Sequence, residues 1–408
     1  MLLSPFTFYR GAALVMASDL SMTPQSGLRV QACGDAHLAN FGVYGSPERK
    51  LVFDINDFDE TAPGPWEWDV KRLVTSLEIA GRANGHDAAS LRRTTRGATE
   101  AYRLAMRGFA GMTNLQVWYA RLDLQEQLEQ FRQSQPARNL RQTEKAVSKA
   151  FTRDSVQALS KLTEVIDGRR QIINQPPLIM RLHDLAASRT DLTSADIEDQ
   201  MRSVIRGYRN TLPSDRRHLL DKYEYVDTAL KVVGVGSVGT RAWILLLLGR
   251  DGNDPLFLQA KEAQASVLER YVGDAGFENA GERVVAGQRL MQSASDIFLG
   301  WERVHSPLDH TERDFYVRQL RDWKGSADVD NIDPQRLFIY GRMCAWTLAK
   351  AHARSGDPIA IGSYLGSGST FDKAIASFAD TYANQNDEDY AALQQAAADG
   401  RIEVRPGL

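Results

Sequence analysis

Residues 34–40 read Gly-Asp-Ala-His-Leu-Ala-Asn, and they directly follow a short apolar run at residues 28–33. This run is bounded by glycines and has the length of a buried strand. A second such run, residues 50–55, leads into the sequence Asp-Ile-Asn-Asp-Phe-Asp-Glu at residues 54–60. Two predicted strands therefore each end in a segment rich in carboxylate and amide side chains.

The acidic segment 54–60 suggests a cation site. Carboxylates at this density repel one another unless cations or hydrogen-bond donors hold them. Mg²⁺ prefers oxygen ligands and is typically held by one or two carboxylates plus substrate phosphates. The structural alternative is a set of Asp caps and turn residues. A calcium-binding loop does not fit, because Phe58 occupies the third ligand position counted from Asp54.

A glycine-rich segment, Gly-Val-Gly-Ser-Val-Gly, occupies residues 234–239. A dinucleotide-binding fold would need a helix directly after it and an acid about 20 residues later, but that position holds Gln259. A hairpin folded over nucleotide phosphates fits better, and Lys261 on the next predicted strand would pair with those phosphates. In this interpretation Gly234, Gly236, Ser237 and Gly239 bind the cofactor. The structural alternative is a glycine-rich hairpin followed by a surface lysine.

The composition limits the class of protein. The 408 residues carry 49 basic and 52 acidic side chains, a net charge of −3, which lacks the basic excess of a nucleic-acid binder. Two cysteines form no disulfide framework, and no apolar run approaches the roughly 20 residues of a membrane span. We therefore expect a soluble cytoplasmic protein without a membrane span or a nucleic-acid partner.

Taken together, the glycine-rich loop, the strand lysine, Asp-x4-Asn and Asp-Phe-Asp are the parts that a phosphoryl-transfer enzyme of the protein-kinase type requires. In ordinary kinases the glycine loop and the lysine precede the catalytic loop. Here the order is reversed, because residues 34–40 precede the glycine loop by about 200 positions. A circular permutation reconciles the two orders, since such exchanges are tolerated at exposed joins. We therefore predict a permuted, two-lobed α+β fold of the protein-kinase type, with a small β-rich lobe and a larger, mainly helical one.

The chain divides into four predicted parts. Residues 1–110 hold the catalytic loop and metal-binding part of the large lobe, and residues 111–227 its helical part. Residues 228–325 form the small nucleotide-binding lobe, with a hinge at 320–325. Residues 326–408 supply the remaining helices, and the first of them, 334–355, is expected to pack beneath the opening strands. Strands are expected near 231–234, 240–248, 256–261, 296–304 and 314–320, and helices from 66 to about 225.

Across nearly its whole length the chain resembles the bacterial family catalogued as domain of unknown function 2252, which is placed with the kinase-like superfamily. The strings that carry the resemblance are Ser4-Pro5-Phe6, Tyr9-Arg10-Gly11, Cys33 to Leu38, Asn56 to Glu60, Gly64 to Asp69, Lys231 to Gly239 and Lys261-Glu262-Ala263. Residues 34–40 also resemble the catalytic loop of aminoglycoside and choline phosphotransferases.

This second resemblance implies roles for individual residues. Asp35 would be the base or the group that orients the acceptor hydroxyl, and Asn40 would be a metal ligand. Asp57 matches the Asp-Phe core of the family motif and is the expected main metal ligand. Asp54 is the rival, because it follows a strand directly and lies 19 positions after Asp35. Asp69 resembles the buried Asp that braces the catalytic loop.

Two assignments remain open at this level. His37 either orients Asp35 or binds phosphate, or it is a structural loop histidine. Lys261 should be paired with a helix carboxylate, for which Glu269 is preferred over Glu282.

The leading interpretation is an ATP- and Mg²⁺-dependent phosphotransferase that acts on an unidentified hydroxyl acceptor, either a small molecule, a lipid headgroup or a protein. The alternatives are transfer of AMP to a protein, a nucleotide-binding pseudokinase that serves as a regulator or scaffold, and a metal-dependent phosphoesterase.

Overall fold

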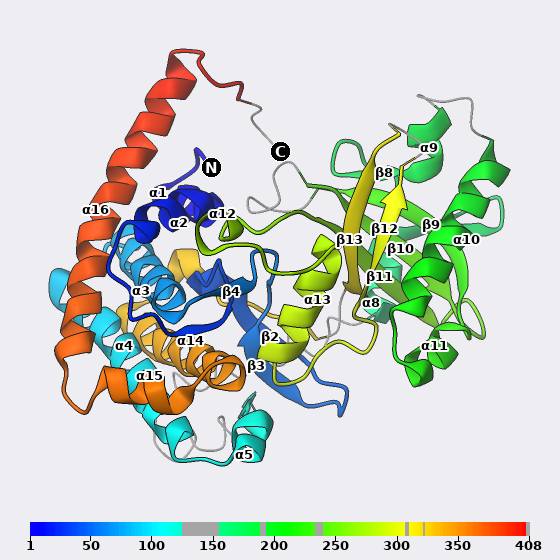
Figure 1. Ribbon diagram of the computed structural model, residues 1–408. Helices are drawn as coiled ribbons and strands as arrows, with labels where there is room; N and C mark the ends of the chain where they lie inside the picture. The colour runs from blue at the N-terminus through cyan, green and yellow to red at the C-terminus, as the bar shows by residue number, and fades with distance from the viewer. Residues whose placement is uncertain (125–154, 188–192, 233–239, 307–309, 321–322, 405–408) are drawn as a thin grey trace.

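The computed structural model describes residues 1–124, 155–187, 193–232, 240–306, 310–320 and 323–404. It is a mixed α+β protein in which a six-stranded sheet lies beside a body of long helices (Figure 1). The predicted α+β class is therefore confirmed.

The sheet is antiparallel throughout, and its strand order is β12-β13-β11-β10-β9-β8. The turn at residues 249–254, which contains Asp251-Gly252, joins two of its central strands. Four of the five predicted strands are confirmed. The strand predicted at 231–234 is misplaced, because the observed strand ends at Lys231, and residues 233 and 234 lie outside the described residues. The bounds are β8 (Ile179–Arg181), β9 (Glu224–Lys231), β10 (Ala242–Leu248), β11 (Pro255–Ala263), β12 (Gly300–His305) and β13 (Glu312–Gln319).

Helices cover both faces of this sheet. On one face lie α9 (Leu182–Ala187), α10 (Ser194–Asn210) and α11 (Ser214–Leu220), and their apolar residues pack against β10 and β11. On the other face lie α8 (Ser155–Leu162) and α13 (Ala280–Met291). We expected residues 111–227 to join the helical lobe, but the described residues from 155 onward pack on the sheet instead. The apolar stripe of α10, which includes Ile197, Met201 and Tyr208, explains this position.

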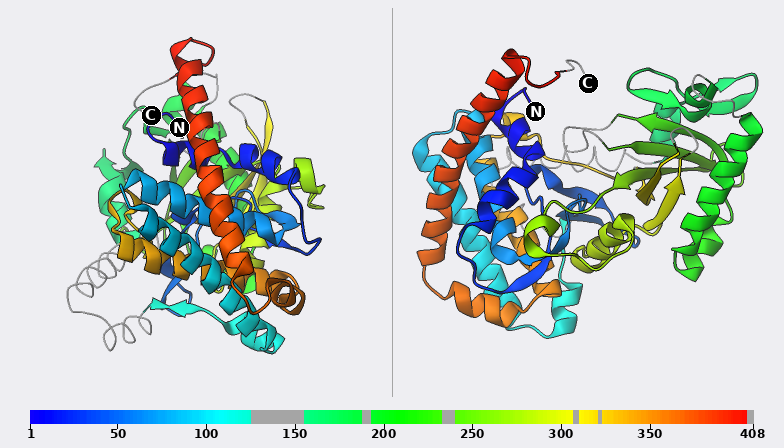
Figure 2. Two further views of the ribbon diagram at one scale, coloured as in Figure 1. Left: turned by 90° about the vertical axis from the view of Figure 1, so that its left-hand side faces the viewer. Right: turned by 45° about the horizontal axis from the view of Figure 1, so that its top comes forward.

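The helical body is built from segments at both ends of the chain (Figure 2). The central helix α3 is buried almost all round, and α4 packs against α14. The predicted helix 334–355 is confirmed as α14, whose N-terminus is capped by Asp333. No helix in the described parts of the chain is long and apolar enough to cross a membrane. The helices are α1 (Pro5–Gly11), α2 (Ala13–Ser21), α3 (Trp66–Ala83), α4 (Ala88–Ala110), α5 (Asn114–Tyr119), α14 (Pro334–Ser355), α15 (Pro358–Leu365) and α16 (Thr370–Ala398).

Short strands connect the two bodies. The predicted strands near the N-terminus are confirmed as β1 (Arg29–Ala32), which pairs with β4 (Ala62–Pro65), and as β3 (Leu51–Ile55), which pairs with β2 (Phe41–Gly45) and β5 (Leu122–Asp123). As expected, α14 packs beneath them, and its Tyr340 hydroxyl lies 2.9 Å from the carbonyl oxygens of Leu38 and Phe41. The chain that leaves the sheet returns to this region at Gly325, which exchanges backbone hydrogen bonds with Val43.

The helices predicted to continue to about residue 225 are interrupted by β6 (Thr163–Ile166), β7 (Arg169–Ile172) and β8. These strands have three or four residues and bury only Ile172 and Ile179 among them, so the sequence contains no alternation that would reveal them.

Candidate functional site

Lys261 meets the acidic segment where the sheet and the helical body adjoin. Its ammonium nitrogen lies 2.5 Å from Asp59 Oδ2 and 3.4 Å from Asp57 Oδ2. The Tyr316 hydroxyl, from the neighbouring strand β13, donates to Asp59 Oδ1 at 2.6 Å. The fold therefore joins residues that are 204 positions apart in sequence.

The charges in this cluster shift one another's pKa values. Burial by itself would lower the pKa of Lys261, but the carboxylates of Asp57 and Asp59 outweigh it and hold this pKa well above its usual range. Burial would likewise raise the pKa of Asp57, yet Lys261 and Arg318 lower it, so this carboxylate is ionised. The pKa of Asp59 is raised by burial and by the adjacent charge of Asp57.

One carboxylate oxygen of Asp57 lacks a hydrogen-bond partner in the described part of the chain. Its Oδ1 is buried and accepts no hydrogen bond from the described residues. A buried carboxylate oxygen without a donor is unfavourable. A cation beside it would remove this penalty, so the observation fits the expected metal ligand.

The loop 34–40 is held next to this cluster. The Asn56 N–H donates to the carbonyl of Asn40 at 2.8 Å, and the Asn40 side-chain nitrogen donates to the carbonyl of Asp35 at 2.8 Å. The Asp35 carboxylate is ion-paired with the buried Arg72 guanidinium, from α3, and lies 3.6 Å from His37 Nε2. Burial lowers the pKa of His37 to about 4, so its imidazole is neutral at pH 7.

Asp69 on α3 braces the start of this loop. Its two oxygens accept hydrogen bonds from Cys33 N–H at 2.6 Å and Gly34 N–H at 2.9 Å. His352 Nε2, from α14, lies 3.1 Å from the same carboxylate. The Tyr102 hydroxyl is hydrogen-bonded to the other ring nitrogen of His352 at 2.8 Å. The position of Asp69 agrees with the bracing role that the resemblance implies.

Asp54 is engaged elsewhere. Its Oδ2 lies 2.6 Å from the ammonium of Lys350, and both side chains are 1% exposed. The same oxygen accepts from the backbone and hydroxyl of Ser293 at 2.8 and 2.6 Å. With these donors in place, Asp54 is a structural anchor for α14, and the geometry favours Asp57 as the metal ligand.

Glu269, which we expected to pair with Lys261, instead contacts Arg283. It belongs to the four-residue helix α12 (Glu269–Val272), and its Oε1 lies 3.5 Å from Arg283 Nε. The buried Arg283 guanidinium, from α13, also donates to the carbonyls of Asp59 and Gln264, both at 2.7 Å. The Arg283 side chain therefore links α13 to the acidic segment. Asp57 and Asp59, and not a helix carboxylate, are the partners of Lys261.

Other parts of the predicted site are placed as follows. Gly234, Gly236, Ser237 and Gly239 lie outside the described residues. Ile244 and Phe257 lie on the same face of the sheet as Lys261, and α8 covers them. Among the described residues no group of three or more His, Cys, Asp or Glu side chains is arranged to hold a metal ion. A metal bound by Asp57 and Asn40 would thus take its remaining ligands from water or substrate, as Mg²⁺ commonly does.

The sequence reasoning missed Arg72, Arg283 and His352 as parts of the site. A signal existed for Arg72, because it lies three positions after Asp69 and so on the same helix face. No comparable spacing points to Arg283 or His352, which reach the site from α13 and α14.

Fold and site together define a mixed α+β protein with a buried lysine–carboxylate cluster beside a braced Gly-Asp-x-His loop. The chain belongs to the family described as uncharacterized proteins conserved in bacteria, DUF2252, whose family model matches residues 1–396. Comparisons with curated proteins and with solved structures found no match.

Proposed function

We propose that this protein is an ATP- and Mg²⁺-dependent phosphotransferase with a permuted fold of the protein-kinase type. The observation that carries the proposal is the meeting of Lys261 and Asp57 in one cluster, 3.4 Å apart. Phosphoryl transfer is catalysed mainly by positioning and by neutralisation of charge, so a cation for phosphate and a carboxylate for metal must lie together.

Each residue has a role in this proposal. Asp57, whose buried Oδ1 has no partner among the residues that the structure describes, and Asn40 would hold Mg²⁺, which neutralises phosphate charge when it is bound. Lys261 would bind phosphate, for which one of its two carboxylate partners must give way. Asp35, partly exposed and oriented by Arg72, would orient the acceptor hydroxyl for in-line attack.

Nucleotide binding is the first test. The native protein should be stabilised by ATP with Mg²⁺ in a thermal-shift assay, by about 2.7 kcal/mol when the ligand is at 100 times its Kd. Asp57→Asn and Lys261→Met should lose this stabilisation. Matched substitutions at exposed positions, Asp251→Asn and Lys222→Met, should keep it. Absence of any ATP-dependent stabilisation of the native protein would overturn the proposal.

Product analysis is the second test. Intact-mass measurement of acceptors incubated with ATP and the native protein should show the gain of a phosphate, whereas the gain of AMP would indicate the alternative transfer. Asp35→Asn should abolish the transfer but leave ATP binding intact. Binding without turnover of any acceptor, unchanged in Asp35→Asn, would identify a nucleotide-binding regulator instead.

A further inference from the structure

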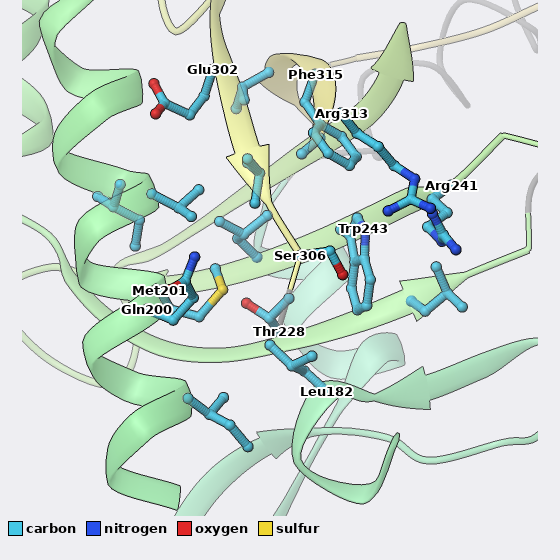
Figure 3. Close-up of a pocket in the computed structure, with 18 of the residues that line it drawn as sticks. Leu182, Gln200, Met201, Thr228, Arg241, Trp243, Glu302, Ser306, Arg313 and Phe315 are labelled. Atoms are coloured by element: carbon cyan, nitrogen blue, oxygen red, sulfur yellow. The ribbon is translucent and has the colours of Figure 1, made fainter. Parts of the chain in front are cut away.

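A second candidate site lies on the other face of the six-stranded sheet. A cavity of about 190 Å³ opens there between the sheet and helices α9 and α10 (Figure 3). Side chains alternate along β11, so Ala260 lines this cavity whereas its neighbour Lys261 faces the acidic segment. The cavity is therefore separate from the site described above.

Most of the cavity wall is apolar. Met201 and Ile205 from α10 face Trp243 and Leu245 from β10 and Val317 from β13. An engineered apolar cavity of about 150 Å³ binds benzene, so the volume here suffices for a ligand with one aromatic ring or a short alkyl chain.

Glu302 on β12 places a carboxyl group at the wall of this cavity. No hydrogen-bond or ion-pair partner for this carboxylate exists among the described residues, and burial raises its pKa to about 7. It lies against α10 at Gly207, where an added Cβ would come within 2.2 Å of Glu302 Oε1. The missing side chain at Gly207 therefore makes the room that the carboxylate occupies.

The cations that line the cavity do not neutralise Glu302. Arg241 and Arg313 extend away from it (Figure 3), and both lie near Glu262, at 3.9 and 3.7 Å respectively. The end of the cavity beside α10 thus carries an acid for which the described residues supply no counter-ion, within an apolar wall. A buried or partly buried charge of this kind is stabilised by a cation that can also donate a hydrogen bond.

We propose that the cavity binds a compact apolar molecule bearing one protonated amine, with the amine on Glu302 and the hydrocarbon part between α10 and the sheet. An uncharged molecule of the same shape would leave the carboxylate without a counter-ion. An anionic one would be repelled by it.

Three probes that share a phenylethyl group test this: 2-phenylethylamine, 2-phenylethanol and 3-phenylpropionate, each titrated calorimetrically into the full-length native protein at neutral pH. The amine should bind about 10- to 100-fold more tightly than the alcohol, because its ammonium brings an opposite charge to the carboxylate in addition to a hydrogen bond. The propionate should bind more weakly than either. Trp243 lines the cavity, so its fluorescence should report binding of the amine.

Glu302→Gln should lower the affinity for the amine to that for the alcohol and leave the alcohol unchanged, whereas Glu312→Gln, at an exposed position of β13, should change neither. Met201→Trp should fill the cavity and weaken both. The series on the native protein decides the question even if a variant fails to fold. Equal affinities for amine and alcohol, preference for the propionate, or binding of no probe would each overturn the proposal.

Discussion

Replacing Lys350 by methionine should destabilise the fold strongly without touching the proposed phosphate cluster. Lys350 and Asp54 form an ion pair of 2.6 Å with each side chain 1% exposed. Methionine keeps most of the apolar stem but leaves the carboxylate buried without its cation. Removal of one partner from a buried pair costs about 3–5 kcal/mol.

The structure places this loss near the lower end of that range. Asp54 keeps three donors in the variant, namely Ser293 N–H at 2.8 Å, Ser293 Oγ at 2.6 Å and Ile55 N–H at 2.9 Å. We therefore expect about 3 kcal/mol, or a fall in Tm of about 6–12 °C at 2–4 °C per kcal/mol. The double variant with Asp54→Asn should lose less than the sum of the single losses, because neither buried charge remains.

Urea denaturation followed by circular dichroism measures these changes, and Lys373→Met on the exposed face of α16 is the control for the substitution itself. A loss below about 1 kcal/mol for Lys350→Met would refute the reasoning from burial. The assignment of Asp54 as an anchor would also be wrong if a folded Asp54→Asn protein lost Mg²⁺-dependent ATP binding while Asp57→Asn retained it.

Three further predictions concern the loop 34–40. Gly34→Ala should prevent stable folding, because residue 34 has φ +80° and an added Cβ would lie 2.1 Å from the Glu60 carbonyl oxygen; circular dichroism of the purified variant checks this. The pKa of His37 is 6.5 in the unfolded chain and about 4 in the folded protein, so between these pH values only the unfolded chain takes up the proton. The urea midpoint should therefore fall as the pH drops from 6.5 to about 4, and it should fall less in His37→Gln. Asp69→Asn should lower the Tm, and it should reduce transfer activity more than ATP binding. The reason is that the single amide oxygen of Asn cannot replace both carboxylate oxygens as acceptor for Cys33 N–H, Gly34 N–H and His352. A variant with native activity and native Tm would contradict the bracing role.

Local patterns predicted most of the sheet strands and the helix α14, but not the short strands β6, β7 and β8. The turn at residues 249–254, the Asp333-Pro334 helix start and the apolar strands each carry their information within a few residues. The assignment of Lys261 and Asp57 to one site rested instead on the combination of motifs that a phosphoryl-transfer enzyme of the protein-kinase type requires. The contact found between them agrees with that expectation.

Partner choice within the site could not be predicted in the same way. Lys261 pairs with Asp59 and Asp57 instead of Glu269, and this outcome depends on the position of α13, which Arg283 sets through backbone carbonyls. A hydrogen bond to a backbone carbonyl cannot be predicted from residue types, since every residue supplies a carbonyl. The anchoring of Asp54 by Lys350 is hidden for a related reason: a buried lysine within a helix pattern looks like any solvated one.

The separation in sequence between the acidic residues and their basic partners also affects the order in which their contacts can form during synthesis. At about 5–20 residues per second, Lys261 leaves the ribosome about 10–40 s after Asp57, which precedes it by 204 positions. Asp35 can pair early with Arg72, but Asp57 and Asp59 stay hydrated until Lys261 is made, and Asp54 and Asp69 until α14 is made. A nascent chain released before residue 350 lacks both Lys350 and His352, so Asp54 and Asp69 cannot be buried with their partners. We expect the N-terminal strands of such a fragment to be accessible to chaperones and proteases. Because Lys350 and His352 are synthesised late, the fold can be completed only when most of the chain has been made.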